Sequence, residues 1–551
     1  MKTKLLFLFF ILLYAAIIGK LFYIQLVSKK FQGSNLYLKT SKITPDRGNI
    51  YDVNGNPLVL NQNSYLLYLE PKKITDKFDL INKLSQNLNI PEASLAAEIN
   101  DNLVYQAIKG GIDEGTKNTI ANLNLPGVGF TYETKRFYPE ASLSAHLLGF
   151  VGKDSQGADV GYFGIEGYYD KDLAGLPGFL ETERDLLGRP IFIGTQNLVS
   201  AENGSDLYLT IDKSVQEIAK SNLETGMEKY QASSGCVIVA DPNTMAIKAL
   251  SCLPDFDPDK YYMFTEKYFE NQAVSEVFEP GSIFKPLIMA AAINEKRISP
   301  TDTMDESGPV KIGQYTIQTW DNTYEGVISM TRILEKSSNV GMVWVGDKLG
   351  PDLMYKYLKK YGFGQTTGID LQGEVPSYLK PQSDLYPIDY ATMTFGQGIA
   401  VTPIQIIRAF ASVINGGRLM RPYVVEKIKY GQEIKTIKPE VQGYTVSPLT
   451  SEIMRKMLID TVDHGEVKWS RPAGYKIGGK TGTAQVPIKG VYDPSKTIAS
   501  FIGFAPADNP KFIVMVMYRD PKASIWGSET AAPVFFDIAR QLFIYYNIPP
   551  Q

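Results

Sequence analysis

Two side chains that could carry out acyl transfer stand three residues apart near the middle of the chain. Ser282 and Lys285 lie in FEPGSIFKPLIMAAAI (residues 278–293), where turn residues give way to an apolar run. If a helix starts near Ser282, both side chains share one face and Pro286 falls in the first turn, where a missing N–H costs little. A lysine in such a dry helix start can lose its proton and act as a base. The pattern predicts a serine nucleophile beside a lysine base.

The S-x-x-K pattern is short, and an ordinary helix start with a capping serine and a solvated lysine gives the same letters. A second match, Ser377–Lys380, stands in the polar stretch EVPSYLKPQSD with no apolar helix behind it. That context indicates a loop. Support for catalysis at Ser282 must therefore come from other parts of the chain.

Two further short motifs follow in the sequence. Ser337–Asn339 forms S-x-N in LEKSSNVGM, and Lys480–Thr483 forms K-T-G-T in GGKTGTAQ. Each is weak alone, because Ser85–Asn87 matches S-x-N in a predicted surface helix and K-T-G-T could be an ordinary turn at a strand edge.

The composition is that of a large globular protein. A chain of 551 residues suggests two to four domains, and 44% hydrophobic with 21% charged residues argues against extensive disorder. A net charge of −3 without a long basic run argues against a nucleic-acid partner. Two histidines and two cysteines cannot form a zinc cluster, and no EF-hand or P-loop pattern is present. We expect no metal or cofactor, although a carboxylate-only Mg²⁺ or Ca²⁺ site stays open.

The first thirty residues are apolar from Leu5 to Gly19 and, after Lys20, again to Val27. As one helix this run spans roughly 35 Å, enough for a hydrocarbon core of about 30 Å. A cleaved signal peptide is the alternative, but no convincing A-x-A site follows and the apolar run continues. We expect an uncut single-pass anchor over residues 1–28 in the lipid bilayer. The N-terminus should be cytoplasmic and the rest extracytoplasmic, although lysines flank both ends of the run and do not set the orientation.

The remaining chain predicts an α+β fold. Residues 29–200 mix short alternating runs with a helical stretch near Asp76 to Asn102. Beyond them, strands come first, then mostly helices, then strands, so helices should flank an antiparallel sheet built from both ends of one domain. The expected elements are strands at 204–212, 235–241, 246–252, 496–506 and 511–520, and helices at 214–230 and around 532–546.

The two cysteines flank the predicted turn at residues 242–245 almost symmetrically. Cys236 and Cys252 should therefore lie nearly opposite each other on one face of a hairpin. An extracytoplasmic domain would permit a disulfide, whereas strands of a sheet core favour two buried free thiols. We expect free thiols, and a Cα separation beyond about 7 Å would exclude the bridge.

The order S-x-x-K, S-x-N, K-T-G is the signature set of penicillin-binding proteins and serine β-lactamases. Nearly the whole chain resembles a class B penicillin-binding protein, a membrane-anchored D,D-transpeptidase of bacterial cell-wall synthesis. Departures are small: Val53 stands where members often have Arg, and Met245 where a turn Gly is usual. The resemblance is carried by RGNIYDVNGNPL (47–58), RFYP (136–139), HLLGFVG (146–152), GIEGYYDKDLAG (164–175), LTIDKSVQ, EPGSIFKP, SSNVGM, TFGQGIAVTPIQ (394–405), KTGTAQ and SFIGFAP.

The resemblance implies three parts: an anchor at 1–28, an elongated non-catalytic pedestal of the dimerisation type at 29–200, and a penicillin-binding/β-lactamase-like transpeptidase domain at 201–551. It implies that Ser282 attacks the penultimate D-Ala carbonyl of a stem peptide. Lys285 would be the base, Ser337 would relay a proton to the leaving amine, and Asn339 would orient Lys285.

The third motif would hold the substrate. By the resemblance, Lys480 suppresses the charge of Lys285 and attracts the terminal carboxylate, which Thr481, Gly482 and Thr483 bind. The backbone N–H groups of Ser282 and Thr483 would form the oxyanion hole. The amine of a neighbouring stem peptide would then resolve the acyl-enzyme. No metal or organic cofactor is implied.

Two other readings remain open. A β-lactam hydrolase or sensor shares the catalytic fold but lacks a pedestal with the RGNIYD pattern, and a non-catalytic scaffold would have degenerate motifs. Within the transpeptidases, elongation enzymes usually carry Asp where this chain has Asn339, so we expect the division type. The resemblance implies β-lactams as covalent inhibitors and, as partners, a membrane glycosyltransferase of the shape-and-division (SEDS) family and other divisome proteins.

Overall fold

The computed structural model describes residues 2–23, 38–183, 196–488 and 491–550. Two compact units are present. One comprises Met1–Arg47 and Ala174–Gly204, and the other comprises Gly48–Leu173 and Ser205–Gln551.

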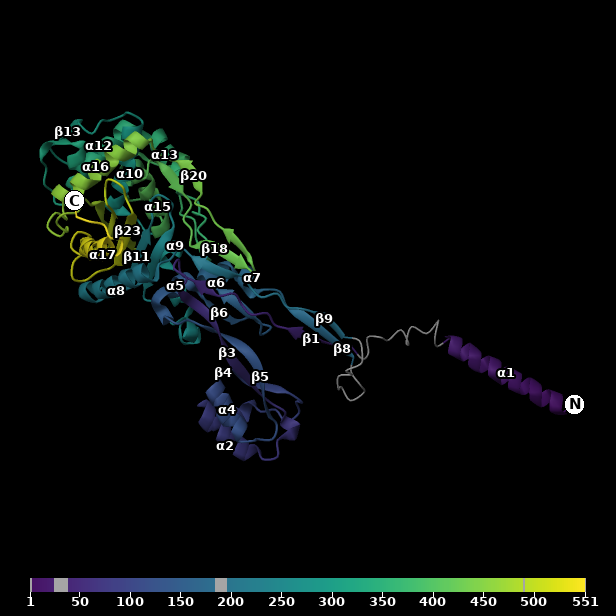
Figure 1. The fold of residues 1–551 in the computed structure, drawn as a ribbon. Coiled ribbons are helices and arrows are strands. Elements are labelled where there is room, and N and C mark those ends of the chain that lie inside the picture. Colours follow the sequence, from purple (N-terminus) through teal and green to yellow (C-terminus); the bar gives the residue numbers. More distant parts are fainter. Residues whose placement is uncertain (1, 24–37, 184–195, 489–490, 551) are drawn as a thin grey trace. The chain divides into compact units, whose positions relative to one another are not determined.

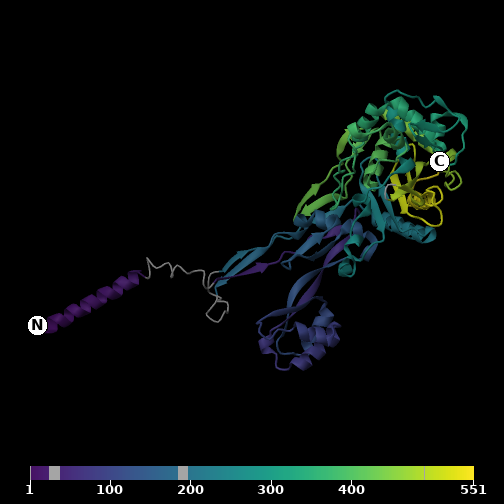
Figure 2. The same cartoon turned by 180° about the vertical axis from the view of Figure 1, so that it is seen from behind.

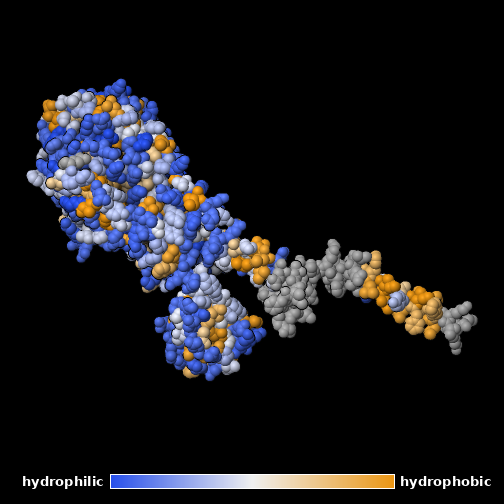
Figure 3. Space-filling model, in the orientation of Figure 1, coloured by the Kyte–Doolittle hydropathy of each residue, from blue (hydrophilic) through white to orange (hydrophobic). Residues whose placement is uncertain are grey.

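The first unit contains one helix and one small sheet. Helix α1 (Lys2–Phe22) exposes a nearly continuous apolar surface, seen in orange in Figure 3. Strand β8 (Gly178–Glu183) pairs antiparallel with β1 (Leu38–Ile43) and β9 (Gln196–Val199). No helix in the described ranges meets the combined length and hydropathy needed to cross a membrane. The anchor expected at residues 1–28 therefore stays a prediction, and its last residues, 24–28, lie outside the described part.

The second unit begins with a long sheet. Its strand order is β19-β18-β10-β2-β3-β4, and β5 also pairs with β3. The helical stretch expected near 76–102 forms two helices that pack buried leucines against this sheet, and Asp76 caps the first by accepting from Asp79 N–H. The elements are β2 (Ile50–Tyr51), β3 (Pro57–Leu69), α2 (Lys77–Leu88), α3 (Glu92–Glu98), β4 (Gln106–Ile112), α4 (Glu114–Asn122), β5 (Val128–Phe137), β10 (Asp206–Leu209), β18 (Val425–Tyr430) and β19 (Glu433–Thr436).

A five-stranded antiparallel sheet with order β12-β11-β23-β22-β21 lies in the other part of this unit. Strand β11, which comes early in this part of the sequence, lies beside β23, which comes late, as the teal and yellow ribbons show in Figures 1 and 2. The predicted antiparallel sheet with flanking helices is therefore confirmed. Its strands are β11 (Ser234–Ala240), β12 (Ile247–Leu253), β21 (Gly478–Ile488), β22 (Val491–Ala505) and β23 (Phe512–Arg519).

Both faces of this sheet are buried. Along β11, Val237 and Val239 face α8 (Lys213–Tyr230) and α17 (Ala531–Tyr545), whereas Ile238 faces the larger core that contains α10 (Lys285–Asn294). Side chains alternate between the faces of a strand, so an unbroken apolar run suits a sheet covered on both sides.

The cysteine prediction was half wrong. Cys236 lies directly opposite Cys252 in the β11–β12 pair, as expected. Their Cα atoms are 4.1 Å apart, and the two residues form a disulfide rather than two free thiols. The burial that favoured free thiols does not distinguish the two states, because a disulfide also packs in an apolar core.

A mostly helical region lies in sequence between β12 and β21 and covers the larger core. Its helices are α9 (Gln272–Ser275), α11 (Met330–Glu335), α12 (Asn339–Leu349), α13 (Pro351–Lys360), α14 (Pro387–Met393), α15 (Pro403–Ile414) and α16 (Pro448–His464). Its short strands are β13 (Thr303–Glu306), β14 (Val310–Ile312), β15 (Tyr315–Ile317), β16 (Gly326–Ser329), β17 (Arg418–Met420) and β20 (Val441–Tyr444). Between β5 and β8 in sequence lie the short helices and strands α5 (Ala145–Leu148), β6 (Phe150–Lys153), β7 (Asp159–Tyr162), α6 (Gly164–Tyr168) and α7 (Asp170–Ala174).

Candidate active site

Ser282 lies in a 3₁₀ turn (Gly281–Phe284) that leads directly into α10, with a proline in the first turn of the helix. Gly281 has φ +57°, and a side chain there would meet Thr483 O at 3.1 Å. This glycine therefore lets the turn approach strand β21 closely. The predicted helix start is present, preceded by the 3₁₀ turn.

Lys285 is fully buried at the beginning of α10. Its Nζ donates to Asn339 Oδ1 at 2.8 Å, to Ser337 Oγ at 3.2 Å and to Ser337 O at 2.5 Å. In the described part of the chain, none of its hydrogen bonds goes to Ser282. Burial first, and then the positive charge of Lys480, lower the pKa of Lys285 well below its ordinary value. An amine with a depressed pKa can accept a proton from a nearby hydroxyl.

The second motif lies between α11 and α12. Ser337 has φ +59°, a left-handed conformation that turns both its carbonyl and its hydroxyl oxygen towards Lys285. Ser338 caps α12 by accepting from Gly341 N–H at 2.9 Å. Asn339 bridges two segments, because its Oδ1 accepts from Lys285 and its Nδ2 donates to Gln318 O at 3.1 Å.

The third motif lies inside β21, the edge strand of the sheet, rather than in a turn. Gly482 has no room for a side chain, since a Cβ would lie 2.4 Å from Ser500 Oγ and 3.0 Å from the Ile283 side chain. Gly482 therefore allows β21 to pack closely against the turn that carries Ser282.

The two threonines of this motif have different partners. Thr481 Oγ1 accepts from Lys480 Nζ at 2.9 Å and donates to Glu466 Oε2 at 2.7 Å. Thr483 Oγ1 accepts from Gly527 N–H at 3.1 Å. Burial lowers the pKa of Lys480, and the carboxylate of Glu466 opposes that effect.

The motifs meet at a cleft of about 500 Å³. Ser282, Ser337 and Asn339 line it from one side, and Thr481 and Thr483 line it from β21. Lys285 and Lys480 are buried and outside the lining, as is Gly482. The other lining residues are Gly281, Trp320, Asp321, Glu325, Arg332, Glu335, Lys336, Phe395, Gln397, His464, Gly465, Glu466, Lys468, Trp469, Trp526, Ser528 and Glu529.

The second S-x-x-K match has a different environment. Ser377 is buried in a loop outside the cleft lining, and its Oγ accepts from Gly364 N–H at 2.8 Å. Lys380 pairs with Asp389 at 3.1 Å. The loop predicted from the sequence is confirmed.

Sequence reasoning missed two carboxylates near the motifs. Glu466 contacts Thr481, and the buried Glu306 contacts Ser338 and Lys336. Neither stands in a recognisable short pattern, so no local signal identifies them. Among the described residues, no group of three or more His, Cys, Asp or Glu side chains is arranged to hold a metal ion.

Two family models match the chain. The penicillin-binding protein transpeptidase domain covers residues 235–540, and the penicillin-binding protein dimerisation domain covers residues 42–209. The chain is a class B penicillin-binding protein. The three motifs fall within the transpeptidase match, while strands β2, β3, β4, β5 and β10 fall within the dimerisation match.

Relatives of this penicillin-binding protein are similar over nearly their whole length. Stage V sporulation protein D of Bacillus subtilis is 32% identical, with 100% of this chain and 87% of that protein covered. Peptidoglycan D,D-transpeptidase FtsI of Escherichia coli is 30% identical, with 97% and 90% covered.

Solved structures match as well. A peptidoglycan synthetase from Bifidobacterium adolescentis is 26% identical with a TM-score of 0.75, and 93% of this chain and 98% of that chain are covered. Penicillin-binding protein 2X from Streptococcus thermophilus, at 24% identity and a TM-score of 0.76 over 92% of this chain and 80% of that one, shares the fold.

Proposed function

We propose that this penicillin-binding protein is a peptidoglycan D,D-transpeptidase that crosslinks stem peptides through an acyl-enzyme on Ser282 and is inhibited by β-lactams. The observation that carries the proposal is the buried Lys285, with a depressed pKa and hydrogen bonds to Ser337 and Asn339, one turn after Ser282. A hydroxyl, a base of depressed pKa and a second hydroxyl in contact with that base suit acyl transfer.

In the acylation step, Ser282 Oγ attacks the carbonyl carbon of the penultimate D-Ala and passes its proton to Lys285 Nζ. The carbonyl oxygen becomes an oxyanion, for which the N–H groups of Ser282 and Thr483 are the proposed donors. As the tetrahedral intermediate collapses, the C–N bond breaks and the hydroxyl of Ser337 protonates the departing D-Ala amine. The Lys285 ammonium then returns a proton to Ser337, which lies 3.2 Å away.

The third motif holds the substrate carboxylate. Thr483 donates its hydroxyl hydrogen to the carboxylate, because its oxygen already accepts from Gly527. Lys480 supplies positive charge, and Thr481 joins by exchanging its bond to Glu466 for one to the substrate. In the second half of the reaction an amine of another stem peptide attacks the ester carbonyl. As the new amide bond, the crosslink, forms, the ester C–O bond to Ser282 breaks and a proton of the attacking amine passes to Ser282 Oγ.

The cellular role we propose is septal wall synthesis. Support comes from the relative named FtsI and from Asn339 in the position where elongation enzymes usually carry Asp. The similarity to stage V sporulation protein D raises a second role, wall synthesis during sporulation. A SEDS-family glycosyltransferase and other divisome proteins are the proposed partners.

We further propose the three-part organisation of an anchor at 1–28, a pedestal at 29–200 and a catalytic domain at 201–551. The anchor would keep the N-terminus cytoplasmic and the catalytic domain outside the cell membrane. The apolar run from Leu5 to Val27 supports the anchor. The Cys236–Cys252 disulfide supports an extracytoplasmic catalytic domain, because disulfides persist in oxidising compartments.

The reaction is tested with the full chain in membranes. A fluorescent penicillin should label the wild type, and a synthetic stem peptide ending in D-Ala-D-Ala should release D-Ala only when Ser282 is intact. An unlabelled wild type, or D-Ala release by Ser282→Ala, would refute the proposed chemistry.

The role is tested by depleting the protein in its host. Filamentous cells would support septal synthesis, whereas round cells would favour elongation. Normal growth with blocked spore formation would favour the sporulation role.

A further inference from the structure

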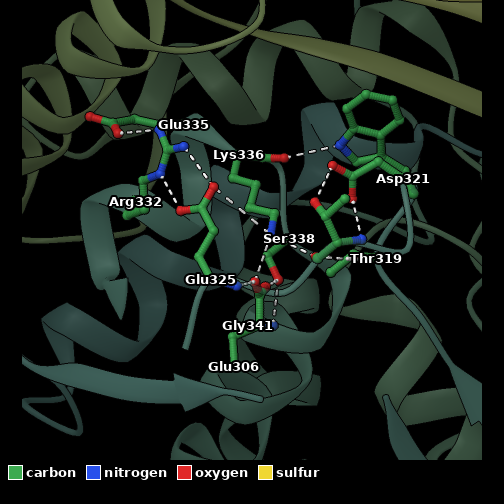
Figure 4. A network of polar contacts seen from close by, with 11 residues as sticks. Glu306, Thr319, Asp321, Glu325, Arg332, Glu335, Lys336, Ser338 and Gly341 are labelled. Carbon is green, nitrogen blue, oxygen red and sulfur yellow. Dashed lines mark hydrogen bonds and ion pairs between the residues drawn. The ribbon is translucent and has the colours of Figure 1, made fainter. Parts of the chain in front are cut away.

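Glu306 is a fully buried carboxylate at the end of β13 and makes three hydrogen bonds. Ser338 Oγ donates to its Oε1 in a short contact, Lys336 Nζ donates to its Oε2 at 2.8 Å, and Glu325 N–H donates to Oε2 at 3.3 Å. Figure 4 shows the side chains of Lys336 and Ser338 directed towards Glu306, whereas the side chain of Glu325 pairs with Arg332. A buried charge is tolerated only with such partners, so this carboxylate fixes the side chains that it contacts.

Two of the three partners flank the catalytic hydroxyl directly. Lys336 precedes Ser337 and Ser338 follows it, and both side chains reach the same carboxylate. Ser337 itself has φ +59°, which is sparsely populated for a residue other than glycine. Such a backbone conformation persists where surrounding contacts over-determine it.

The segment is held from its other side as well. Lys336 Nζ also donates to Thr323 O at 2.7 Å, and Lys336 O accepts from Trp320 Nε1 at 3.2 Å. The cap on α12 needs only the lone pair of Ser338 Oγ, which accepts from Gly341 N–H. Glu306 takes the remaining hydrogen of that hydroxyl and thereby fixes its rotamer through a charge-assisted bond.

We propose that Glu306 is a positioning residue for the acylation reaction: it clamps Lys336 and Ser338 so that Ser337 presents both oxygens to Lys285. The inference rests on the proposed function, because Glu306 is proposed to position the residues around Lys285, the proposed base. Glu306 contacts neither the substrate nor the reacting atoms. It acts by holding the two neighbours of Ser337 in place and, at a distance, by its negative charge.

The clamp has an electrostatic consequence at Lys285. Glu306 and, from the segment after α16, Glu466 favour the charged form of Lys285, whereas Lys480 on β21 and burial disfavour it. Removing the charge of Glu306 therefore lowers the pKa of Lys285. Acylation requires the neutral amine of Lys285. The acidic limb of the pH profile of the acylation rate should therefore move to lower pH.

The experiment measures the rate constant for acylation by benzylpenicillin across pH in the full chain, with thermal unfolding in parallel. Glu306→Gln should slow acylation by roughly tenfold to a hundredfold, the usual effect of a misplaced catalytic group, and should move the acidic limb to lower pH. Glu306→Asp keeps the charge but shortens the reach, so it should leave the limb in place while still slowing the reaction.

A matched control removes another fully buried carboxylate. Glu166 in α6 is 0% exposed and pairs with Arg136 Nε at 2.7 Å, outside the cleft lining. Glu166→Gln should lower the unfolding temperature without changing the acylation rate constant. If Glu306→Gln does not fold, the neutral pair Glu306→Gln/Lys336→Met leaves neither buried charge without its partner. This pair should also acylate slowly, with the acidic limb at lower pH, because Lys336 is not among the charges that shift the pKa of Lys285.

The clamp would be overturned if Glu306→Gln were acylated at the wild-type rate with an unmoved acidic limb. If the single variant does not fold, the same result in the neutral pair would overturn it. An equal loss of rate in Glu166→Gln would overturn it too, since the effect would then be general destabilisation. These results differ from failure of the proposed function, in which the wild type itself would not be acylated.

Discussion

Thr481 donates its hydroxyl hydrogen to Glu466, with Thr481 Oγ1 2.7 Å from Glu466 Oε2. The same oxygen accepts from Lys480 Nζ at 2.9 Å, so a carboxylate, a hydroxyl and an amine form one chain beside the cleft. Glu466 also favours the charged form of both Lys285 and Lys480. Glu466 therefore couples Lys285, the proposed base, to Lys480, the residue proposed to attract the substrate carboxylate.

Glu466→Gln should shift the whole pH profile of benzylpenicillin acylation to lower pH. Loss of the negative charge lowers the pKa of Lys285, so the neutral base forms at lower pH and the acidic limb moves down. It also lowers the pKa of Lys480, so the positive charge is lost at lower pH and the alkaline limb moves down too. Glu452→Gln, on the exposed side of α16 beside Lys456, is the control and should leave both limbs unchanged. Coincident profiles for wild type and Glu466→Gln would contradict the coupling.

Asn339→Asp tests Lys285 as the base by the opposite change, the addition of a negative charge. The new carboxylate would still accept from Lys285, whose Nζ lies 2.8 Å from Asn339 Oδ1, but would add a negative charge and lose the donor to Gln318 O. The pKa of Lys285 should rise, so the acidic limb of acylation should move to higher pH. Asn339→Ala adds no charge, and any slowing that it causes should leave the limb at or below its wild-type position. A limb that moves down in Asn339→Asp would contradict the assignment of Lys285 as the base.

The sequence predicted the architecture where local patterns decide it. Apolar runs bounded by turn residues identified β11, β12 and β23, and the order of strands and helices predicted an antiparallel sheet made from both ends of the domain. The three motifs identified the lining of the cleft because their residue types and order are specific in combination. Local pattern did not decide whether K-T-G-T is a turn or a strand. Glycine favours a turn, but it also occurs in strands where another part of the chain approaches closely, as at Gly482.

Contacts that depend on tertiary packing could not be predicted from the sequence. Glu306 comes from a short strand and Glu466 follows a helix, and each reaches its motif only through the packing of separate elements. The cysteine pair shows the same limit in another form. Register placed Cys236 opposite Cys252, but an apolar core accommodates two thiols as readily as a disulfide.

Replacing the disulfide should destabilise the catalytic half of the chain. Cys236 and Cys252 are 16 residues apart, and closing a loop of that size contributes about 3 kcal/mol in the chain-entropy account. Cys236→Ala/Cys252→Ala should therefore lower the urea concentration at which penicillin binding is lost, while leaving the acylation rate constant of the folded protein near normal. The single variant Cys236→Ala breaks the same bridge and serves as the comparison. Equal midpoints for wild type and both variants, under oxidising conditions, would show that the bridge does not stabilise the fold.

The two S-x-x-K matches provide an internal test of context against pattern. Ser282 opens onto the cleft and is followed by the buried Lys285, whereas Ser377 is bonded to Gly364 in a loop and Lys380 is half-exposed beside Asp389. Burial and the neighbouring Lys480 depress the pKa of Lys285, which gives this lysine a physical reason to act as a base.

Benzylpenicillin should therefore acylate Ser282 and leave Ser377 unmodified. Ser282→Ala should abolish labelling, and Lys285→Ala should slow it at least about a hundredfold, because a general base typically contributes 10² to 10⁴. The matched variants Ser377→Ala and Lys380→Ala should label at near wild-type rates. Intact-mass spectrometry followed by peptide mapping reads out all four variants, and the adduct should persist because a site built for an amine acceptor need not activate water. An adduct on Ser377, or undiminished labelling of Ser282→Ala, would refute the assignment of Ser282 as the acylated serine.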